Sequence, residues 1–335
     1  MKILITGGTG YIGSHTTLEV VNAGHEVIVV DDFSNSSPKV IEIIKSLTDN
    51  PISFEEANIK DQKKIKSIFE EYNPEAVIHF AAFKAVEESI RKPLDYYENN
   101  VIGSLSLLKV MKDYNVKNFV FSSSASVYGD PESVPVTELS PTISKHPYGN
   151  TKLVIELFLK QLHLADPKWS ICILRYFNPV GAHKSGNLGE DPQDQPTNLF
   201  PFIGKVAIGQ YKEVKVYGDD YPTRDGTGIR DYIHISDLAS GHLLPLENLF
   251  QKPSFNIYNL GTGKGHSVLE VIKAFEDACQ KEIPYRIVRR RDGDIAECYA
   301  DPTKAKKELG WDAKLDLAEM CKDTWNWQSK NPDGY

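Results

Sequence analysis

The sequence predicts an α/β fold: a doubly wound parallel sheet in the first half of the chain and a smaller, interleaved α/β lobe after it. In the first half of the chain, short apolar runs alternate with longer segments whose apolar residues recur at helical spacing. The runs are continuously apolar, which indicates strands buried on both faces rather than strands with one face in water. A parallel sheet covered by helices on both sides satisfies both observations.

The expected elements follow in chain order. The apolar runs predict strands at residues 2–6, 26–31, 76–81, 118–123 and 171–177. Helical spacing predicts helices over 12–23, 61–72, 94–114 and 148–165. After about residue 178 the chain is richer in Gly, Asp, Pro and Asn, and its elements are shorter, although 255–261 can return to the large sheet and 315–328 forms a closing helix. We therefore expect a domain of residues 1–177, with a returning segment near 230–261, and a second lobe of residues 178–335.

Composition limits the classes of partner. The chain has 335 residues, of which 41% are hydrophobic and 25% charged, and its net charge is −8. This acidic balance argues against nucleic-acid binding through a basic surface. No apolar stretch approaches the roughly 20 residues of a membrane span. The four cysteines form no C-x-x-C pair, so we expect no metal site, no disulfide framework and a reducing, cytoplasmic location.

A glycine pattern follows the first expected strand. In "TGGTGYIG", Gly7, Gly10 and Gly13 are spaced three residues apart, and a helix is expected to begin over them. Such glycines let the backbone approach a pyrophosphate, which the helix N-terminus attracts. The second strand ends in Asp31, whose carboxylate suits an adenosine ribose and repels a 2′-phosphate, so NAD is favoured over NADP. The alternative is a tight glycine turn with an exposed aspartate.

A phenol and an ammonium share one helix face. Tyr148 and Lys152 are four residues apart in "HPYGNTKL", and Ser122 to Ser124 end the fourth expected strand. An ammonium about 4 Å away, at an effective dielectric of about 20, favours the phenolate by about 4 kcal/mol before desolvation opposes it. We therefore expect Lys152 to lower the pKa of Tyr148 and make it a base for a sugar hydroxyl. The alternative is an amphipathic helix with an exposed lysine and a half-buried tyrosine.

These stretches, together with "FSSSASVYGD", "LRYFNPVGAH" and "GDDYPTRDGTGIRDYIHISDLA", resemble the extended short-chain dehydrogenase/reductase superfamily. Within it, the chain is similar over essentially its whole length to the UDP-glucose 4-epimerase family. The resemblance implies a Rossmann-type fold, UDP-hexose substrates and a role in galactose metabolism. It also implies isomerase activity, in which bound NAD transiently oxidises C4 of UDP-galactose or UDP-glucose to a 4-keto sugar.

The resemblance also implies roles for particular residues. The catalytic group would be Ser124, Tyr148 and Lys152. The NAD pocket would comprise these three and Gly7, Gly10, Tyr11, Ile12, Gly13, Asp31, Asp32, Asn35, Ser36, Asn58, Ile59, Phe80, Ala81, Lys84, Asn99, Ser122, Tyr176 and Pro179. The UDP-sugar would meet Lys84, Ser124, Tyr148, Phe177, Asn178, Asn198, Leu199, Tyr217, Arg230, Arg291, Asp294 and Cys298. Two arginines suit a diphosphate because their forked donors bind it bidentately; the alternative is a pair of surface arginines.

Two positions depart from the family pattern. Many relatives have Asp where this chain has Asn58, an adenine contact, but an amide oxygen can still accept that hydrogen bond. Relatives restricted to glucose and galactose have a bulky Tyr where this chain has Cys298. A small residue there leaves room for an N-acetyl group, so UDP-GlcNAc and UDP-GalNAc are expected substrates as well. The alternative is that Cys298 is simply a small buried hydrophobe.

Other interpretations stay open. A nucleotide-sugar 4,6-dehydratase shares the fold and the Tyr/Lys pair, but typically has Thr-Asp-Glu where this chain has Ser124–Ala125–Ser126. A non-catalytic NAD-binding regulator usually lacks the Tyr or the Lys. The segments 101–111 and 148–165 are apolar on nearly every side, which predicts a helical interface between two copies, as the family resemblance also implies. The alternative is a well-packed monomer.

Overall fold

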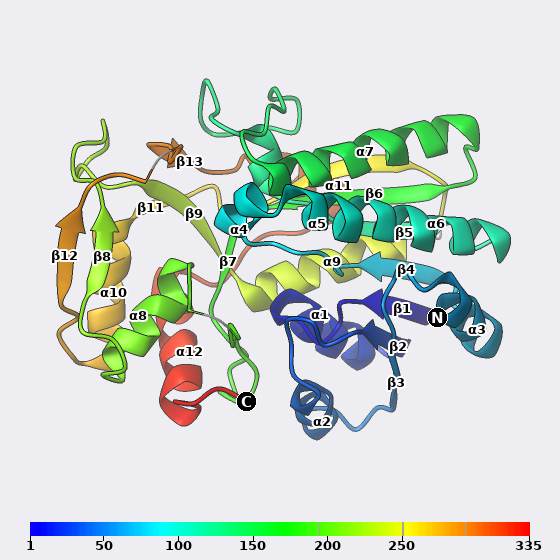
Figure 1. The fold of residues 1–335 in the computed structure, drawn as a ribbon, viewed down its shortest axis with the longest axis horizontal. Coiled ribbons are helices and arrows are strands. Elements are labelled where there is room, and N and C mark those ends of the chain that lie inside the picture. The colour runs from blue at the N-terminus through cyan, green and yellow to red at the C-terminus, as the bar shows by residue number, and fades with distance from the viewer. Residues whose placement is uncertain (194, 250, 292) are drawn as a thin grey trace.

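A computed structural model describes residues 1–193, 195–249, 251–291 and 293–335 and contains a seven-stranded sheet (Figure 1). All its strand pairs are parallel, in the order β10-β6-β5-β4-β1-β2-β3. The strands are β1 (Lys2–Thr6), β2 (Glu26–Asp31), β3 (Ile52–Glu56), β4 (Ala76–His79), β5 (Asn118–Ser122), β6 (Ser170–Tyr176) and β10 (Phe255–Leu260). The order reverses between β1 and β4, the point where open α/β sheets bind their ligands.

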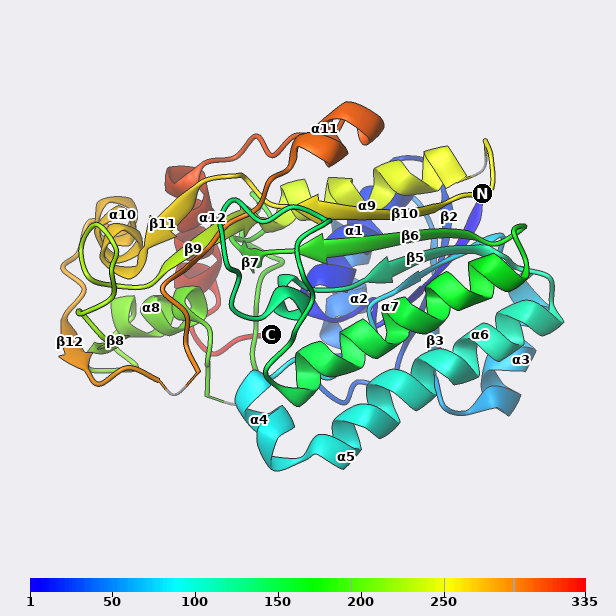
Figure 2. The same ribbon diagram turned by 90° about the horizontal axis from the view of Figure 1, so that it is seen from above.

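Helices cover both faces of this sheet (Figures 1 and 2). Two separate apolar clusters fill the space between sheet and helices, one on each face. On one face lie α1 (Tyr11–Asn22), α2 (Lys39–Ser46), α9 (Ile235–Leu249) and α11 (Thr303–Leu309). On the other lie α3 (Gln62–Tyr72), α6 (Gly103–Asp113) and α7 (Pro147–Ala165). Burial on both faces explains why the central strands are apolar at successive positions.

The segment expected as one helix over 94–114 has an interruption. It begins as α5 (Pro93–Tyr96), passes through the π-helical turn η1 (Tyr97–Ile102) and continues as α6. Before it lies the short α4 (Val86–Arg91). A π-turn adds a residue to the helical turn and often occurs at functional sites. Here its buried Asn100 binds both the Phe83 backbone and Thr151 of α7.

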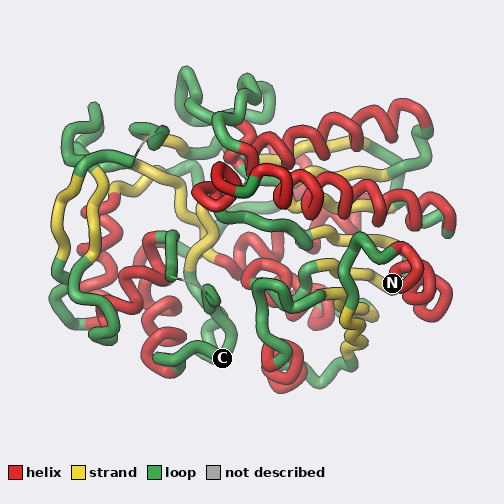
Figure 3. The backbone as a smooth tube through the Cα atoms, viewed as in Figure 1, coloured by secondary structure: helices red, strands yellow, loops and turns green. Residues whose placement is uncertain are grey.

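The second lobe surrounds smaller sheets, at the left of Figures 1 and 3. One sheet joins β7 (Asn178–Val180), β9 (Ile229–His234), β11 (Gly265–Ser267) and β13 (Glu297–Cys298); the other pairs β8 (Val214–Tyr217) with β12 (Tyr285–Val288). They pack with α8 (Leu199–Ala207), α10 (Val268–Cys279) and α12 (Leu317–Lys330). Between β9 and β11 the chain returns to the large sheet as α9 and β10, which interleaves the two parts.

The expected large parallel sheet and its helices are confirmed, as is the return of residues 255–260 as a sheet strand. Sequence analysis missed β3, whose sequence ISFEE is half polar. The structure keeps β3 at the sheet edge, where one side has no neighbour and polar residues are tolerated. All four cysteines are buried free thiols. Among the described residues, no helix combines the length and the apolar character that crossing a membrane requires.

Candidate active site

The glycine loop brings β1, β4 and the start of α1 into close contact. Gly7 adopts a left-handed φ of 70°, and a Cβ there would lie 2.6 Å from the Ala81 backbone nitrogen. A Cβ on Gly13 would lie 2.1 Å from the Gly7 carbonyl oxygen. Both positions therefore require glycine, and the loop can approach a ligand without an intervening side chain.

The start of α1 is suited to an anion. Within residues 10–14 no side chain caps the helix, and its first turn has no acidic residue. The free N–H groups and the helix dipole consequently favour a phosphate group. Beside it, Asp31 accepts hydrogen bonds from the Thr9 N–H at 3.1 Å, the Phe33 N–H at 3.0 Å and the Ser36 hydroxyl at 3.1 Å. The glycine cradle and this fixed carboxylate fit a dinucleotide.

Asn58, where many relatives have Asp, belongs to the adenine end of the expected pocket. Its amide Nδ2 donates to Asp32 Oδ2 at 2.6 Å, while its Oδ1 accepts from the Lys60 N–H at 2.9 Å. The second lone pair of that oxygen can still accept a hydrogen bond. Ile59 is buried next to it, whereas Asn35 is exposed in the loop after β2.

Residues that follow β4 extend the pocket wall. Phe80 and Ala81 are partly buried directly after the strand, and Tyr11 and Ile12 are partly buried in the first turn of α1. The exposed Lys84 lies with its Nζ 3.2 Å from Glu190 Oε1 and 5.9 Å from the centre of the Tyr11 ring. Asn99, in the π-turn, donates to Asn100 at 3.2 Å. The structure thus places Tyr11 and Ile12 after the carboxyl end of β1 and Phe80 and Ala81 after that of β4, with Asn99 in the turn that leads into α6.

Helix α7 presents Tyr148 and Lys152 to the carboxyl end of β5. His146 caps the helix by accepting from the Gly149 N–H at 3.1 Å, and Pro147 occupies the first turn. Tyr148 and Lys152 are 6% and 2% exposed. Lys152 Nζ donates to the Ser122 carbonyl at 2.7 Å and lies 4.9 Å from the Phe121 ring centre. The alternative of an exposed lysine beside a half-buried tyrosine is therefore wrong.

Burial governs the protonation of this pair. It lowers the pKa of Lys152 to about 7, and the carboxylate of Glu156 opposes that change. Burial also raises the pKa of Tyr148, while a hydrogen bond with Ser124 acts in the opposite direction. The expectation that Lys152 lowers the pKa of Tyr148 is wrong for the protein groups by themselves, because desolvation penalises both charges. The Ser124 hydroxyl, held where it accepts from the Ser126 N–H at 3.1 Å, is the favourable contact of the phenol.

The end of β6 closes the site from the neighbouring strand. Ser122 donates to the Tyr176 hydroxyl at 3.2 Å. Phe177 is buried, and Asn178 and Pro179 continue into β7, Asn178 exposed and Pro179 partly buried. These residues therefore join the large sheet to the second lobe beside the serine-rich strand end.

The second lobe brings two of the expected cations next to other expected substrate residues. The Arg291 guanidinium lies 4.0 Å from the Tyr217 ring centre, and Arg230 forms an ion pair with Asp294. An open pocket of about 550 Å³ is lined by residues that include Arg289, Arg290 and Arg291. Its lining combines these three arginines with Asp219 and Asp220. The alternative of isolated surface arginines does not describe Arg230, whose side chain is 19% exposed.

The remaining substrate residues lie on α8 and β13. Asn198 precedes α8, and its Nδ2 donates to Glu190 Oε1 at 3.2 Å; Leu199 begins the helix. Cys298 is 7% exposed and belongs to the same apolar cluster as Phe177. Burial raises the pKa of its thiol to about 11. The side chain is thus a small neutral group beside an expected sugar contact.

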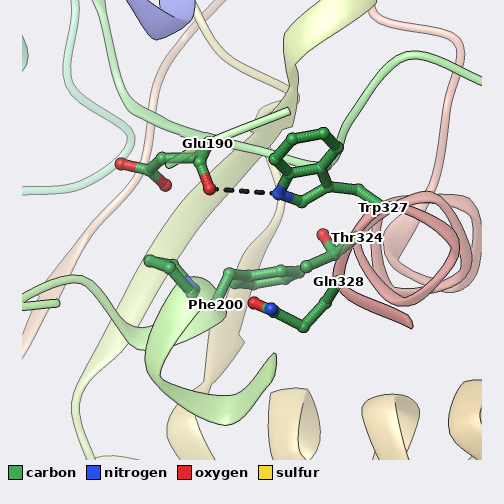
Figure 4. Close-up of a pocket in the computed structure, with 7 residues that line it drawn as sticks. Glu190, Phe200, Thr324, Trp327 and Gln328 are labelled. Atoms are coloured by element: carbon green, nitrogen blue, oxygen red, sulfur yellow. Dashed lines mark hydrogen bonds between the residues drawn. The ribbon is translucent and has the colours of Figure 1, made fainter. Parts of the chain in front are cut away.

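Sequence analysis missed several residues that hold the site together. Glu190 contacts both Lys84 and Asn198, and its backbone oxygen accepts from the Trp327 indole at 3.2 Å (Figure 4). A small cavity borders this contact. Glu156 and Asn100 were missed as well, because one lies inside an apolar helix and the other follows an identical residue. The signal for Glu156 was a carboxylate in an otherwise apolar run, four residues after Lys152.

Comparison with known proteins places the chain in a family. A family model described as GDP-mannose 4,6 dehydratase matches residues 4–324. The UDP-glucose 4-epimerase of Bacillus subtilis (strain 168) is 54% identical over 335 residues, which cover 100% of this chain and 99% of that protein. A crystal structure of UDP-glucose 4-epimerase from Bifidobacterium longum in complex with NAD⁺ and UDP is 53% identical and has a TM-score of 0.97 over 100% of both chains.

A more distant structure is the UDP-Glc/GlcNAc 4-epimerase from Campylobacter jejuni. It is 37% identical, with a TM-score of 0.86, and the match covers 98% of this chain and 99% of that one. The family model is broad, whereas the full-length relatives at 50% identity or more share one description. The chain therefore belongs to the UDP-glucose 4-epimerase family, within the larger group that the GDP-mannose 4,6 dehydratase model describes.

Proposed function

We propose that the chain is an NAD-dependent isomerase that interconverts UDP-galactose and UDP-glucose. The observation that carries the proposal is the buried group formed by Tyr148, Ser124 and Lys152 at the carboxyl end of β5, in the same sheet whose strands β1 and β2 lead into the glycine cradle and Asp31. When bound, NAD supplies the reversible oxidation and reduction of the sugar at C4. Because it ends each cycle in its starting state, it is neither consumed nor exchanged.

The chain's own groups move the proton. Tyr148 Oη accepts the proton of the 4-hydroxyl, directly or through the Ser124 hydroxyl with which it is hydrogen-bonded, and returns it when the sugar is reduced. Lys152, fixed on the Ser122 carbonyl, lies one helical turn away and compensates the phenolate charge. Bound NAD⁺ would add positive charge to a site in which burial alone keeps the phenol protonated.

Inversion at C4 requires that the nucleotide part of the substrate is bound tightly and the sugar part weakly. Arg230 and Arg291 supply the cations for the diphosphate, and Tyr217, against which Arg291 lies, supplies an aromatic face. Phe177 and Cys298 offer the sugar an apolar wall without charged groups. The nucleotide would stay anchored while the loosely held 4-keto sugar turns over and presents its other face.

The small side chain of Cys298 supports activity on N-acetylated sugars. It belongs to the same apolar cluster as Phe177, and a cysteine there takes up less volume than a tyrosine would. One of the similar structures bears the name UDP-Glc/GlcNAc 4-epimerase, which supports this substrate class. UDP-GlcNAc and UDP-GalNAc are therefore proposed as additional substrates.

The chemistry of the strand end argues against a 4,6-dehydratase, despite the description of the family model. Elimination of water across C5 and C6 needs an acid and a base next to the serine. Here Ser124 is followed by Ala125 and Ser126, neither of which titrates in the physiological range. A non-catalytic NAD-binding regulator is less well supported, because both Tyr148 and Lys152 are present and buried.

One assay separates these three functions. The purified protein is first examined by absorbance for bound nicotinamide and then incubated with UDP-galactose without added reductant. Formation of UDP-glucose supports the epimerase, and a 4-keto-6-deoxy product would identify a dehydratase. An unchanged substrate would leave only the regulator. Repeating the assay with UDP-glucose, UDP-GlcNAc and UDP-GalNAc determines the substrate range.

The exposed apolar surface supports a homodimer. Large apolar side chains are exposed on adjacent helices: Ile90 on α4, Leu94 on α5, Ile102 in η1, Leu105 on α6, and Leu157 and Leu164 on α7. Figure 2 shows α6 and α7 side by side on this face. A second copy related by a two-fold axis would bury the same surface on both subunits.

The free thiols of the four cysteines support a cytoplasmic location.

A further inference from the structure

The carboxylate of Glu156 lies where three site-bearing elements meet. It is 4% exposed and follows Tyr148 and Lys152 on the same face of α7, at spacings of four residues. Ser123, between the two strand-end serines of the site, donates to Glu156 Oε1 at 2.5 Å. Arg175, which precedes Tyr176, donates to both carboxylate oxygens from Nε at 3.0 and 3.2 Å and to Oε2 from Nη2 at 2.5 Å.

We propose that Glu156 is a positioning residue: it fixes the ends of β5 and β6 against the helix face that carries Tyr148 and Lys152, and it supplies the negative charge opposite Lys152. The kinetic part of this inference rests on the proposed function. The geometry makes the carboxylate the common partner of the serine beside Ser124 and of the arginine beside Tyr176. Movement of α7 relative to either strand would therefore break a buried, charge-assisted hydrogen bond.

The other titratable groups around Lys152 do not supply that charge. Tyr148 on α7, Tyr176 on β6 and Tyr128, which follows β5, have pKa values raised by burial. His79 on β4 has its pKa lowered by burial to about 3, so it is neutral at neutral pH. Arg175 is positive and is paired with Glu156 itself. Among these groups, only Glu156 favours the ammonium form of Lys152.

Two variants separate positioning from simple stability. Glu156→Gln alone leaves the buried Arg175 without its charged partner, which is strongly destabilising and can prevent folding. The double variant Glu156→Met with Arg175→Met removes both charges, a change that is often tolerated because no unpaired ion remains. Ser123→Ala removes one contact and leaves the ion pair. Ser89→Ala is its matched control, because Ser89 is equally buried and, within the described residues, its hydroxyl bonds only the Val86 carbonyl of its own helix.

The experiment measures kcat and KM for UDP-galactose from pH 5 to 9. We expect Ser123→Ala to lower kcat about tenfold with KM within about twofold, and Ser89→Ala to match the wild type. In the double variant, Lys152 loses the Glu156 carboxylate that favours its ammonium form, which makes the first deprotonation of the Tyr148–Lys152 pair easier. The acid limb of kcat should therefore move to lower pH by at least about half a unit. Unchanged kcat in Ser123→Ala together with an unmoved limb would overturn the proposal.

A second readout does not depend on turnover. Protein labelled with ¹³C at lysine Cε is titrated by NMR, and the Lys152 signal is assigned by its absence in Lys152→Met. The titration of that signal should shift to lower pH in the double variant and stay in place in Ser89→Ala. If the wild type fails to convert UDP-galactose, the proposed function fails while this titration still decides the role of Glu156. An identical Lys152 titration in wild type and double variant would reject the role.

Discussion

At the scale of single residues, the Tyr148–Lys152 pair shows that burial, and not only proximity, decides charge. Proximity alone predicts a phenolate beside an ammonium, yet desolvation raises the pKa of the phenol and lowers that of the amine to about 7. Burial therefore disfavours the charged form of both groups. The positive nicotinamide ring of a bound dinucleotide would favour the phenolate of Tyr148, the form that can accept a proton.

Tyr148→Phe tests this assignment with a minimal change of shape. Removal of the hydroxyl abolishes proton transfer, so kcat should fall by about 10²–10⁴-fold, the range attributed to a positioned acid or base. The bound nicotinamide, measured by absorbance of the purified protein, should be retained because the ring stays in place. Turnover equal to the wild type would contradict the mechanism, whatever the cofactor content.

Cys298→Tyr tests substrate range at one position. The larger side chain would occupy the space beside Phe177, and we expect at least about tenfold loss of kcat/KM for UDP-GlcNAc, since overpacking costs about 1–3 kcal/mol. The values for UDP-galactose should stay within about threefold, which serves as the internal control. Retention of both activities would show that residue 298 does not limit the sugar pocket.

The sequence allowed candidate site residues to be proposed more easily than their pKa values. Gly7, Gly13 and Tyr148 could be identified because each has a local spacing that points to its chemistry. The pKa of Lys152 could not be predicted, because it depends on how deeply α7 packs against β5. Glu156 was hidden for a similar reason: its partners, Ser123 and Arg175, are 33 and 19 residues distant in the chain.

At the scale of elements, the contact between the glycine loop and α1 positions the dinucleotide cradle. The long apolar strands could be predicted because each is buried on both faces. In contrast, β3 and the two- to four-residue strands of the second lobe are too short or too polar to show an apolar pattern that identifies a strand. The short strands of the second lobe are specified by pairing with β9 or with each other, and β3 by pairing with β2. Pairing partners are not visible in a single sequence.

Gly13→Ala tests the loop. A methyl group would lie 2.1 Å from the Gly7 carbonyl, so the loop must open. We expect NAD affinity, measured by calorimetry, to fall about ten- to hundredfold, because overpacking costs about 1–3 kcal/mol. Gly10→Ala is the matched variant in the same loop, since its methyl group would meet that carbonyl at 3.4 Å, an ordinary contact, and should weaken binding less. Equal affinity in Gly13→Ala and wild type would exclude a tight cradle.

His79 connects three elements and makes their packing sensitive to pH. On β4, it contacts Thr6 of β1 at 2.6 Å and Ser104 of α6 at 2.9 Å. Burial lowers its pKa from 6.5 to about 3. Between these values the unfolded chain binds a proton that the folded chain does not, so stability decreases as pH falls from about 6.5 toward 3.

His79→Asn should remove that contribution. In urea titrations between pH 5 and 6, the free energy of unfolding of the variant should change less steeply with pH than that of the wild type. The difference is at most about 1.4 kcal/mol per pH unit, the value for one proton. The variant should be less stable at pH 7.5, where the histidine is neutral in both states and its two hydrogen bonds are intact. Parallel slopes for the two proteins would show that His79 is protonated in the folded state.

At the scale of the whole molecule, the chain crosses repeatedly between its two parts. β6 leads directly into β7, and α9 and β10 return from the small sheet to the large one. Residues expected to hold cofactor and substrate consequently lie on both sides of the crossing. Glu190 bridges them by contacting Lys84 and Asn198. Such an arrangement lets an anchored nucleotide span both parts while the sugar lies at the strand ends.

The outer apolar surface provides the last prediction. Leu157 and Leu164 are 56% and 68% exposed on α7, and placing them in water costs hydrophobic free energy that a second copy would recover. We expect light scattering after size exclusion to give the wild type about twice the chain mass of 37.6 kDa. Leu157→Glu with Leu164→Glu should give the monomer mass. Each subunit would bring two glutamates to a two-fold interface, which would therefore bury four unpaired charges. Tyr285→Glu, at an exposed aromatic on β12 in the second lobe, is the control and should leave the mass at the wild-type value. A monomeric wild type, or a double variant of unchanged mass, would mean that this helical face does not join two copies.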